Sequence, residues 1–124
     1  MIQHEGPGWR LARDPLRRNF TVIIGGAGWV VELSEQEWTS LMPLVTELVA
    51  QHEKLVNQLM PDESICLEMG KEYWWACLDG DRKAWSLQLI FEGDRKDLRG
   101  FEAYWPIPAA QSVTNAMRLM WDCG

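Results

Sequence analysis

The sequence predicts an α+β fold in which two helices pack on antiparallel β-sheet, in the order strands, helix, strands, helix. Short β-branched segments come before residue 34, one long amphipathic stripe follows, and four alternating apolar segments joined by short charged turns come after Pro61. Short turns indicate antiparallel neighbours, because parallel strands need long crossovers. With 124 residues, 47% of them hydrophobic, the chain has the size and composition of a single domain, 1–124.

The N-terminal third contains one short strand and a hairpin. Trp9–Arg13 alternates apolar and polar residues and ends at an Asp-Pro turn signal. The β-branched run 20–24 stops at the glycine-rich segment 25–28 and resumes at Trp29–Leu33, which is typical of a β-hairpin. His4, near the N-terminus, is expected to lie on a frayed end.

A long helix follows. Ser34 and Glu37 have the S-x-x-E spacing of a capping box, so the helix should begin there. Apolar-stripe positions then recur at spacings of three and four: Trp38, Leu41, Val45, Leu48, His52, Leu55 and Leu59. The helix is expected to continue to about Met60 and to end at Pro61. Because Pro43 has no amide hydrogen, we expect either a kink or a short first helix followed by a second.

The second half of the chain predicts four strands and a helix. The strands are Ser64–Met69, Glu72–Leu78, Ala84–Glu92 and Phe101–Trp105. The turns between them are Gly70-Lys71, 79–83 with its Asp79-Gly80 dipeptide, and 93–100. Two prolines then lead into an amphipathic segment, Ala109–Trp121, which predicts a C-terminal helix.

Composition restricts the classes of function. Twelve Lys plus Arg against eighteen Asp plus Glu give a net charge of −6, which repels phosphate backbones unless positive charge gathers on one face. The sequence has three widely spaced cysteines, Cys66, Cys77 and Cys123, which form no CxxC motif and have no paired histidine. We therefore expect no disulfide framework, no metal and no cofactor. The sequence has neither a secretory signal nor an apolar run of about 18 residues. It predicts a cytoplasmic protein without a membrane segment.

The sequence also predicts that the protein is not an enzyme. The glycines of 25–28 precede a strand, whereas a phosphate-binding loop precedes a helix. His52 lies on the apolar stripe of the long helix and is expected to be a half-buried core or interface residue. Carboxylates close in sequence are interpreted as solvated turn residues: Asp79 with Asp81, and Asp94 with Asp97. The class of function that the sequence predicts is therefore a binding module.

Eight tryptophans exceed the usual need of a core of this size. On the strand 72–78, Trp75 faces one way and Trp74 the other, so both faces of the sheet carry apolar bulk. This pattern predicts a partner surface, most simply in a homodimer. The C-terminal helix, with Met117, Met120 and Trp121, is a second expected contact for another subunit.

Basic and aromatic residues near the strand ends are the candidate binding site. A single nucleic-acid strand could contact them by base stacking and phosphate pairing. The predicted residues are Arg10, Arg13, Arg17, Arg18, Lys71, Trp74, Arg82 and Lys83. A protein-interaction or scaffold role, in which the same side chains anchor an interface, is the alternative. An enzyme with a small-molecule pocket, and ordinary solvated edge residues, also remain open.

Four segments carry a resemblance to a known family: 6–10, Trp29–Trp38, Gly100–Glu102 and Trp105-Pro106. Over nearly the whole chain the sequence resembles a family of small cyanobacterial proteins of unknown function. That family is similar in fold to single-stranded-DNA-binding regulators, represented by plant Whirly proteins and positive-cofactor coactivators. The resemblance implies a strongly curved antiparallel sheet, oligomerisation through helices, and a cyanobacterial cytoplasm. Whirly proteins bind DNA through a lysine-rich strand motif, which this sequence lacks.

Overall fold

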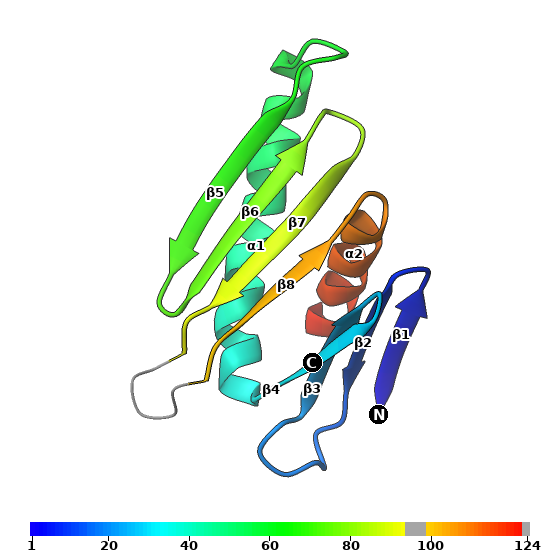
Figure 1. Cartoon of the computed structure of the whole chain (residues 1–124), viewed down its shortest axis with the longest axis vertical. Helices are drawn as coiled ribbons and strands as arrows, with labels where there is room; N and C mark the ends of the chain where they lie inside the picture. The colour runs from blue at the N-terminus through cyan, green and yellow to red at the C-terminus, as the bar shows by residue number, and fades with distance from the viewer. Residues whose placement is uncertain (94–98, 123–124) are drawn as a thin grey trace.

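The computed structural model describes residues 1–93 and 99–122 and contains two four-stranded antiparallel sheets and two α-helices (Figure 1). The first sheet contains β1 (Ile2–Gly6), β2 (Trp9–Arg13), β3 (Val22–Gly26) and β4 (Trp29–Leu33). The second contains β5 (Ile65–Lys71), β6 (Trp74–Gly80), β7 (Trp85–Phe91) and β8 (Phe101–Trp105). The predicted α+β class is confirmed. Each sheet pairs its strands in sequence order, because every connection within it is a hairpin.

The N-terminus is a strand, so the expectation of a frayed end is wrong. β1 pairs with β2 and places His4 opposite Leu11. The connecting turn contains Gly8 at φ +75°, and the corresponding turn between β3 and β4 contains Gly28 at φ +80°. Glycine is the residue that adopts this left-handed conformation without steric cost. The alternation of apolar and polar residues in β1 is weak, so the strand is held by its pairing with β2, which extends along all five of its residues.

Helix α1 (Glu35–Leu55) joins the two sheets. The predicted capping box is present: the Glu37 amide donates to Ser34 Oγ at 3.1 Å, and the Ser34 amide donates to the Glu37 carboxylate at 2.8 Å. Pro43 lies inside one continuous helix, so the division into two helices is wrong. Its ring is exposed while the residues on either side of it are buried, and that packing holds the helix together. A 3-10 turn, η1 (Val56–Gln58), follows.

The β5–β6 turn lies two residues later than the sequence predicts. Glu72 and Tyr73 form it, with Glu72 at φ +57°, whereas Gly70 and Lys71 belong to β5. An even shift leaves every side chain on its expected face, because strand side chains alternate with a period of two. Cross-strand partners do change, and Glu68 now lies opposite Cys77.

The β6–β7 turn comes after Gly80 rather than at the Asp79-Gly80 dipeptide. Asp81 Oδ1 accepts hydrogen bonds from the amides of Lys83 and Ala84, at 2.8 and 2.9 Å. These backbone hydrogen bonds from Ala84 and Lys83 lower the pKa of Asp81. Of the two predicted carboxylate pairs, Asp94 and Asp97 lie outside the described residues.

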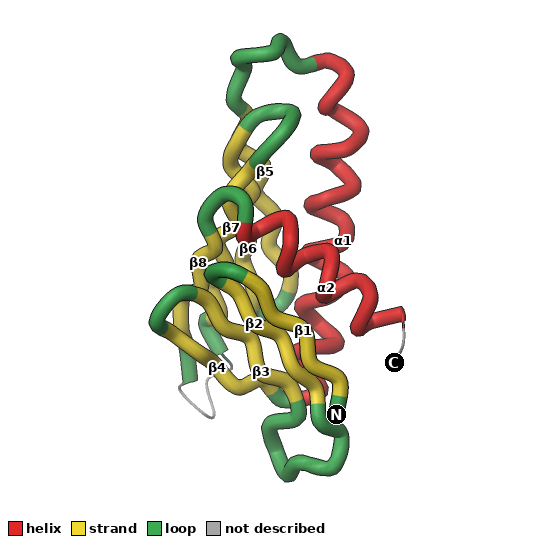
Figure 2. The backbone as a smooth tube through the Cα atoms, turned by 90° about the vertical axis from the view of Figure 1, so that its right-hand side faces the viewer, coloured by secondary structure: helices red, strands yellow, loops and turns green. Residues whose placement is uncertain are grey.

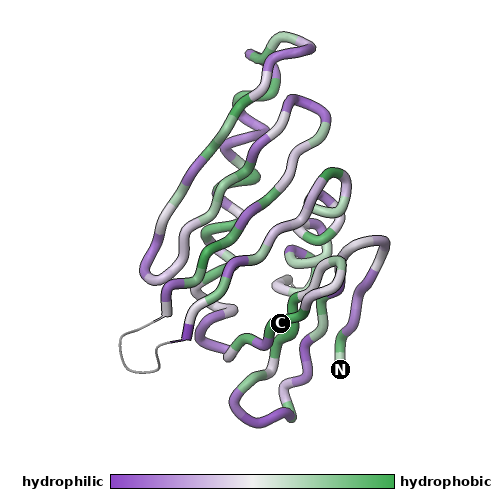
Figure 3. Tube along the Cα trace, viewed as in Figure 1, coloured by the Kyte–Doolittle hydropathy of each residue, from purple (hydrophilic) through white to green (hydrophobic). Residues whose placement is uncertain are grey.

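Both helices lie on the same side of the sheets (Figure 2). Helix α1 packs on β5 and β6, while α2 (Ala109–Asp122) packs on β2 and β7 and so spans the two sheets. Trp105 is fully buried at the junction, where its indole donates to the Gly25 carbonyl at 2.9 Å and its ring lies 5.2 Å from that of Trp29. The loop between β2 and β3 is hydrophilic (Figure 3).

Helix α2 turns its methionines inward. Met117 and Met120 are fully buried, so the expectation that they contact another subunit is wrong. Trp121 stays 40% exposed.

Among the described residues, neither helix is long and apolar enough to cross a membrane.

Candidate functional site

The predicted basic residues do not gather on one face. Arg10 is exposed on the face of the first sheet opposite the core, and Arg18 is exposed in the β2–β3 loop. Lys71 ends β5 at one end of the β5–β6 hairpin, whereas Arg82 and Lys83 lie in the turn beyond the other end. Those two line an open hollow of about 300 Å³ beside His52 and Glu53. Among the residues that the structure describes, these basic side chains form no continuous phosphate track.

Two of the predicted arginines form ion pairs. Arg13 pairs with Glu35 at the start of α1, and Arg17 pairs with Glu32 at 2.9 Å. Burial on its own would raise the pKa of Glu35, but hydrogen bonds from Thr21 and Arg13, together with the charge of Arg13, outweigh it and lower the pKa. The first pair attaches β2 to the start of α1, and the second attaches the β2–β3 loop to β4.

Trp74 is a core residue. Its side chain is 2% exposed, and its indole donates to Ser40 Oγ at 3.0 Å. Its ring lies 4.7 Å from that of Phe91 and 5.7 Å from that of Phe101. The ring is therefore not accessible for stacking on a ligand, as its place in the predicted site would require.

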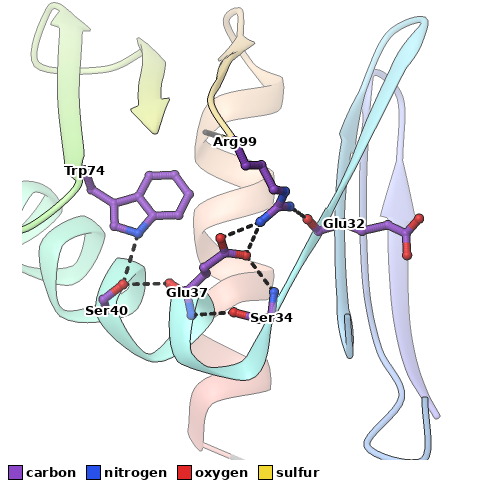
Figure 4. A network of polar contacts seen from close by, with 6 residues as sticks. All are labelled: Glu32, Ser34, Glu37, Ser40, Trp74 and Arg99. Atoms are coloured by element: carbon purple, nitrogen blue, oxygen red, sulfur yellow. Dashed lines mark hydrogen bonds and ion pairs between the residues drawn. The ribbon is translucent and has the colours of Figure 1, made fainter. Parts of the chain in front are cut away.

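A polar network that the sequence did not predict joins three elements (Figure 4). Arg99, just before β8, donates to both carboxylate oxygens of Glu37 and to the Glu32 carbonyl. Its guanidinium also lies 4.8 Å from the centre of the Phe20 ring, a cation–π distance. Arg99 and Glu37 are 62 residues apart, so no local sequence pattern indicates their contact. The network holds the start of α1 between the sheets.

His52 is a satisfied core residue. It is 5% exposed, its Nε2 lies 2.9 Å from the Asp81 carbonyl, and its ring lies 6.0 Å from that of Trp85. Since a carbonyl oxygen can only accept, Nε2 carries the hydrogen and donates. The interpretation of His52 as a core residue is confirmed.

The second sheet has an open face on the side away from both helices (Figures 1 and 2). Tyr104 is 52% exposed there, and Trp75 and Ile90 are half-buried. Strand register and alternation place eight further polar, small or thiol side chains around them: Cys66, Glu68, Gly70, Cys77, Asp79, Ser86, Gln88 and Glu102. No lysine or arginine in the described part of these strands shares this face. Trp75 and Ile90 lie opposite each other on the two inner strands, Tyr104 lies on edge strand β8, and the carboxylates of Glu68, Asp79 and Glu102 lie around these three residues.

Two cysteines meet on the open face. Cys66 Sγ lies 3.0 Å from Cys77 Sγ, and the Glu68 carboxylate completes a group of three donor atoms within 4.8 Å of one another. Burial, a hydrogen bond with Cys66 and the negative charge of Glu68 and Asp79 raise the pKa of Cys77 to about 12. The sequence missed this cluster because a turn at 70–71 pairs Cys66 with Trp75 instead. The third cysteine, Cys123, lies outside the described residues.

Comparisons with known proteins place the chain in a family. A search of the curated proteins gave no match. A crystal structure from Prochlorococcus sp. NATL2A, described as a protein with unknown function from the DUF155 family, is 45% identical. The match covers 98% of this chain and 99% of that one, with a TM-score of 0.91. The expected cyanobacterial relationship is thereby supported, whereas similarity to Whirly domains is not shown. A model described as Domain of unknown function (DUF1818) matches residues 4–120, and the chain belongs to that family.

Proposed function

We propose that the protein is a non-enzymatic protein-binding module whose open β5–β8 face binds a partner with basic residues around an apolar contact. The observation that carries this proposal is the arrangement of Trp75, Ile90 and Tyr104, with acidic residues at the border. Aromatic residues that are partly exposed at the centre of a patch are typical anchors of protein interfaces. A border of carboxylates attracts a basic partner and steers its approach.

Charge argues against nucleic acid on this face. Glu68, Asp79 and Glu102 are exposed there, and phosphates would be repelled by them. None of the eight predicted binding residues contributes to this face. Arg13 and Arg17 are in ion pairs with Glu35 and Glu32, and Trp74 is buried. Scattered, partly neutralised cations provide little counterion release.

Charge also argues against a second copy of the chain on this face. A symmetric dimer would place the same surface against itself, and its carboxylates would find no lysine or arginine on the described part of this face to pair with. The sequence predicts a homodimer through the apolar bulk of the sheet, whereas self-association through the helices, which the family resemblance implies, would leave the open face accessible. Light scattering of the purified chain checks that prediction.

A titration with three probes tests the proposal. The probes are a peptide of alternating Lys and Leu, the same peptide with Glu in place of Lys, and a mixed-sequence single-stranded oligonucleotide. We expect the basic peptide alone to shift backbone amide resonances of β6–β8. Tyr104→Ala should weaken its binding about tenfold, ~1.4 kcal/mol. Leu119→Ala, at an α2 position 56% exposed, is the matched control and should leave binding unchanged.

Two results would overturn the proposal. The first is basic-peptide binding that shifts other regions or is insensitive to Tyr104→Ala. The second is oligonucleotide binding that weakens steeply with salt and shifts amides around Arg10 or Lys83, which would support the nucleic-acid alternative instead. Unfolding midpoints of both variants show whether either change acts through stability.

A further inference from the structure

The two thiols of the cluster on β5 and β6 have chemistry that the proposed function does not use, whereas the third member, Glu68, also belongs to the acidic border of the open face. Cys66 and Glu68 extend from β5, and Cys77 extends from β6 directly opposite Glu68. The three donor atoms lie within 4.8 Å of one another on an accessible surface. We propose that Cys66, Glu68 and Cys77 form a zinc-binding site.

The donor set selects the metal. Two thiolates exclude the hard cations Mg²⁺ and Ca²⁺, which take oxygen ligands. The carboxylate favours Zn²⁺, which accepts sulfur and oxygen together, over Cu(I), which is selected by soft sulfur ligands. Three protein ligands leave the fourth tetrahedral position open to water or to another ligand. Each thiol loses its proton to solvent as its zinc–sulfur bond forms.

The distance between the two sulfurs suits a single metal ion bound by both. With Zn–S bonds of about 2.3 Å, two thiolates on tetrahedral zinc lie ~3.8 Å apart. The sulfurs are 3.0 Å apart in this structure, so they need to separate by less than about 1 Å to bind one zinc ion together. Rotation of side chains at an exposed position provides this movement without a change in the backbone. Glu68 reaches the same point because its strand position faces Cys77.

A disulfide is the competing chemistry for the pair. Cys66 lies opposite Asp79 rather than Cys77, so the two cysteines are diagonal neighbours. Diagonal neighbours on antiparallel strands have Cα atoms about 7–8 Å apart, whereas disulfides span about 4.4–6.8 Å. A disulfide would also leave no role for the third donor, Glu68.

Zinc titration of the whole chain in a Cys123→Ser background tests the site without interference from the third cysteine. The protein is kept reduced, and a chromophoric chelator reports competition for zinc. We expect one zinc per chain, and Co²⁺ should produce thiolate-to-metal charge-transfer absorption. Cys66→Ser and Cys77→Ser should each abolish that absorption and weaken zinc binding by more than about 100-fold, beyond the effect of losing an outer-shell partner. Glu68→Gln should weaken binding about tenfold.

Glu102→Gln is the matched control, because it removes a carboxylate from the same face two strands away. It should leave zinc affinity unchanged. The proposal is overturned if the reduced chain binds no zinc, if binding survives either cysteine substitution, or if one zinc binds per two chains. A pair that remains disulfide-bonded under reductant also overturns it. Peptide binding to the open face is scored separately, so either proposal can fail alone.

Discussion

At the residue scale, Glu37 has two separate roles that substitutions can separate. Its carboxylate accepts from the Ser34 amide and pairs with Arg99, and its side chain is 13% exposed. Glu37→Gln keeps a capping group but removes the charge opposite Arg99, so we expect a loss of about 1–2 kcal/mol. Glu37→Ala removes both and should cost about 2–3 kcal/mol. Urea unfolding measures both values.

Gln36→Ala is the control for this pair, because Gln36 is exposed on the same turn of α1. It should change the free energy of unfolding by less than about 0.5 kcal/mol. Equal losses for Glu37→Gln and Glu37→Ala would show that capping contributes nothing measurable.

Glu35 predicts a pH dependence of stability. Its pKa in the folded chain lies below the ordinary value of 4.5, so its ion pair with Arg13 contributes fully above that value. The contribution disappears as the pH falls through the folded pKa. Its side chain is 44% exposed, which limits the contribution to below about 1 kcal/mol. Glu35→Gln should therefore be less stable than the parent at pH 7 and converge with it below pH 4.5. A constant difference across that range contradicts the assignment.

At the element scale, two hairpins of the first sheet share one design. Gly6-Pro-Gly-Trp9 and Gly26-Ala-Gly-Trp29 both place a left-handed glycine in the turn and a tryptophan ring over the first glycine. A Cβ on Gly26 would collide with the indole of Trp29, and one on Gly6 would collide with the indole of Trp9. Space for the ring therefore requires glycine at each of these positions.

Gly26→Ala should displace the Trp29 ring from its contact with Trp105. We expect a loss of about 1–3 kcal/mol, typical of overpacking, measured by chemical denaturation. Gly70→Ala is the matched strand control, since its Cβ would meet no atom closer than 3.7 Å. That change should be neutral or slightly stabilising, because alanine restricts the unfolded chain. Equal effects at both positions would show that ring crowding is not the cause.

Local sequence patterns predicted most helices and strands but misplaced the β5–β6 and β6–β7 turns, and the β5–β6 turn sets which residues of those two strands lie opposite each other. Capping chemistry located the start of α1, and alternation located β8 at its observed bounds. The repeated G-x-G-W segment contains the signal for β1, since the second copy had already predicted a hairpin. The β5–β6 turn was misplaced because glycine marks turns in general, while here Glu72 adopts the left-handed conformation.

The candidate site depends on that pairing. A turn at Glu72–Tyr73 brings Cys66 and Cys77 together, and no composition rule indicates it. Likewise, the contact of Arg99 with Glu37 depends on how the second sheet packs against the start of α1. Basic residues could be identified by type, but only the fold shows that Arg13 and Arg17 already have carboxylate partners.

At the scale of the whole molecule, Trp105 connects the two sheets. Its buried indole donates to Gly25 of the first sheet while its backbone belongs to β8 of the second. The chain is predicted to unfold as one domain, so far-UV circular dichroism and tryptophan fluorescence should follow a single coincident transition. Separate transitions would show that each sheet folds with its own helix.

Trp105→Phe tests this connection directly. The substitution keeps an aromatic ring but removes the indole hydrogen bond to the Gly25 carbonyl and opens space beside Trp29. We expect a loss of about 2–4 kcal/mol from the unmade hydrogen bond and the cavity. Trp121→Phe, at a position 40% exposed, is the matched control and should cost less than about 1 kcal/mol. If the two substitutions cost the same, the Trp105 hydrogen bond does not hold the sheets together, and the connection rests on the other contacts between them, the packing of α2 on both sheets and the hydrogen bond from Arg99 to the Glu32 carbonyl.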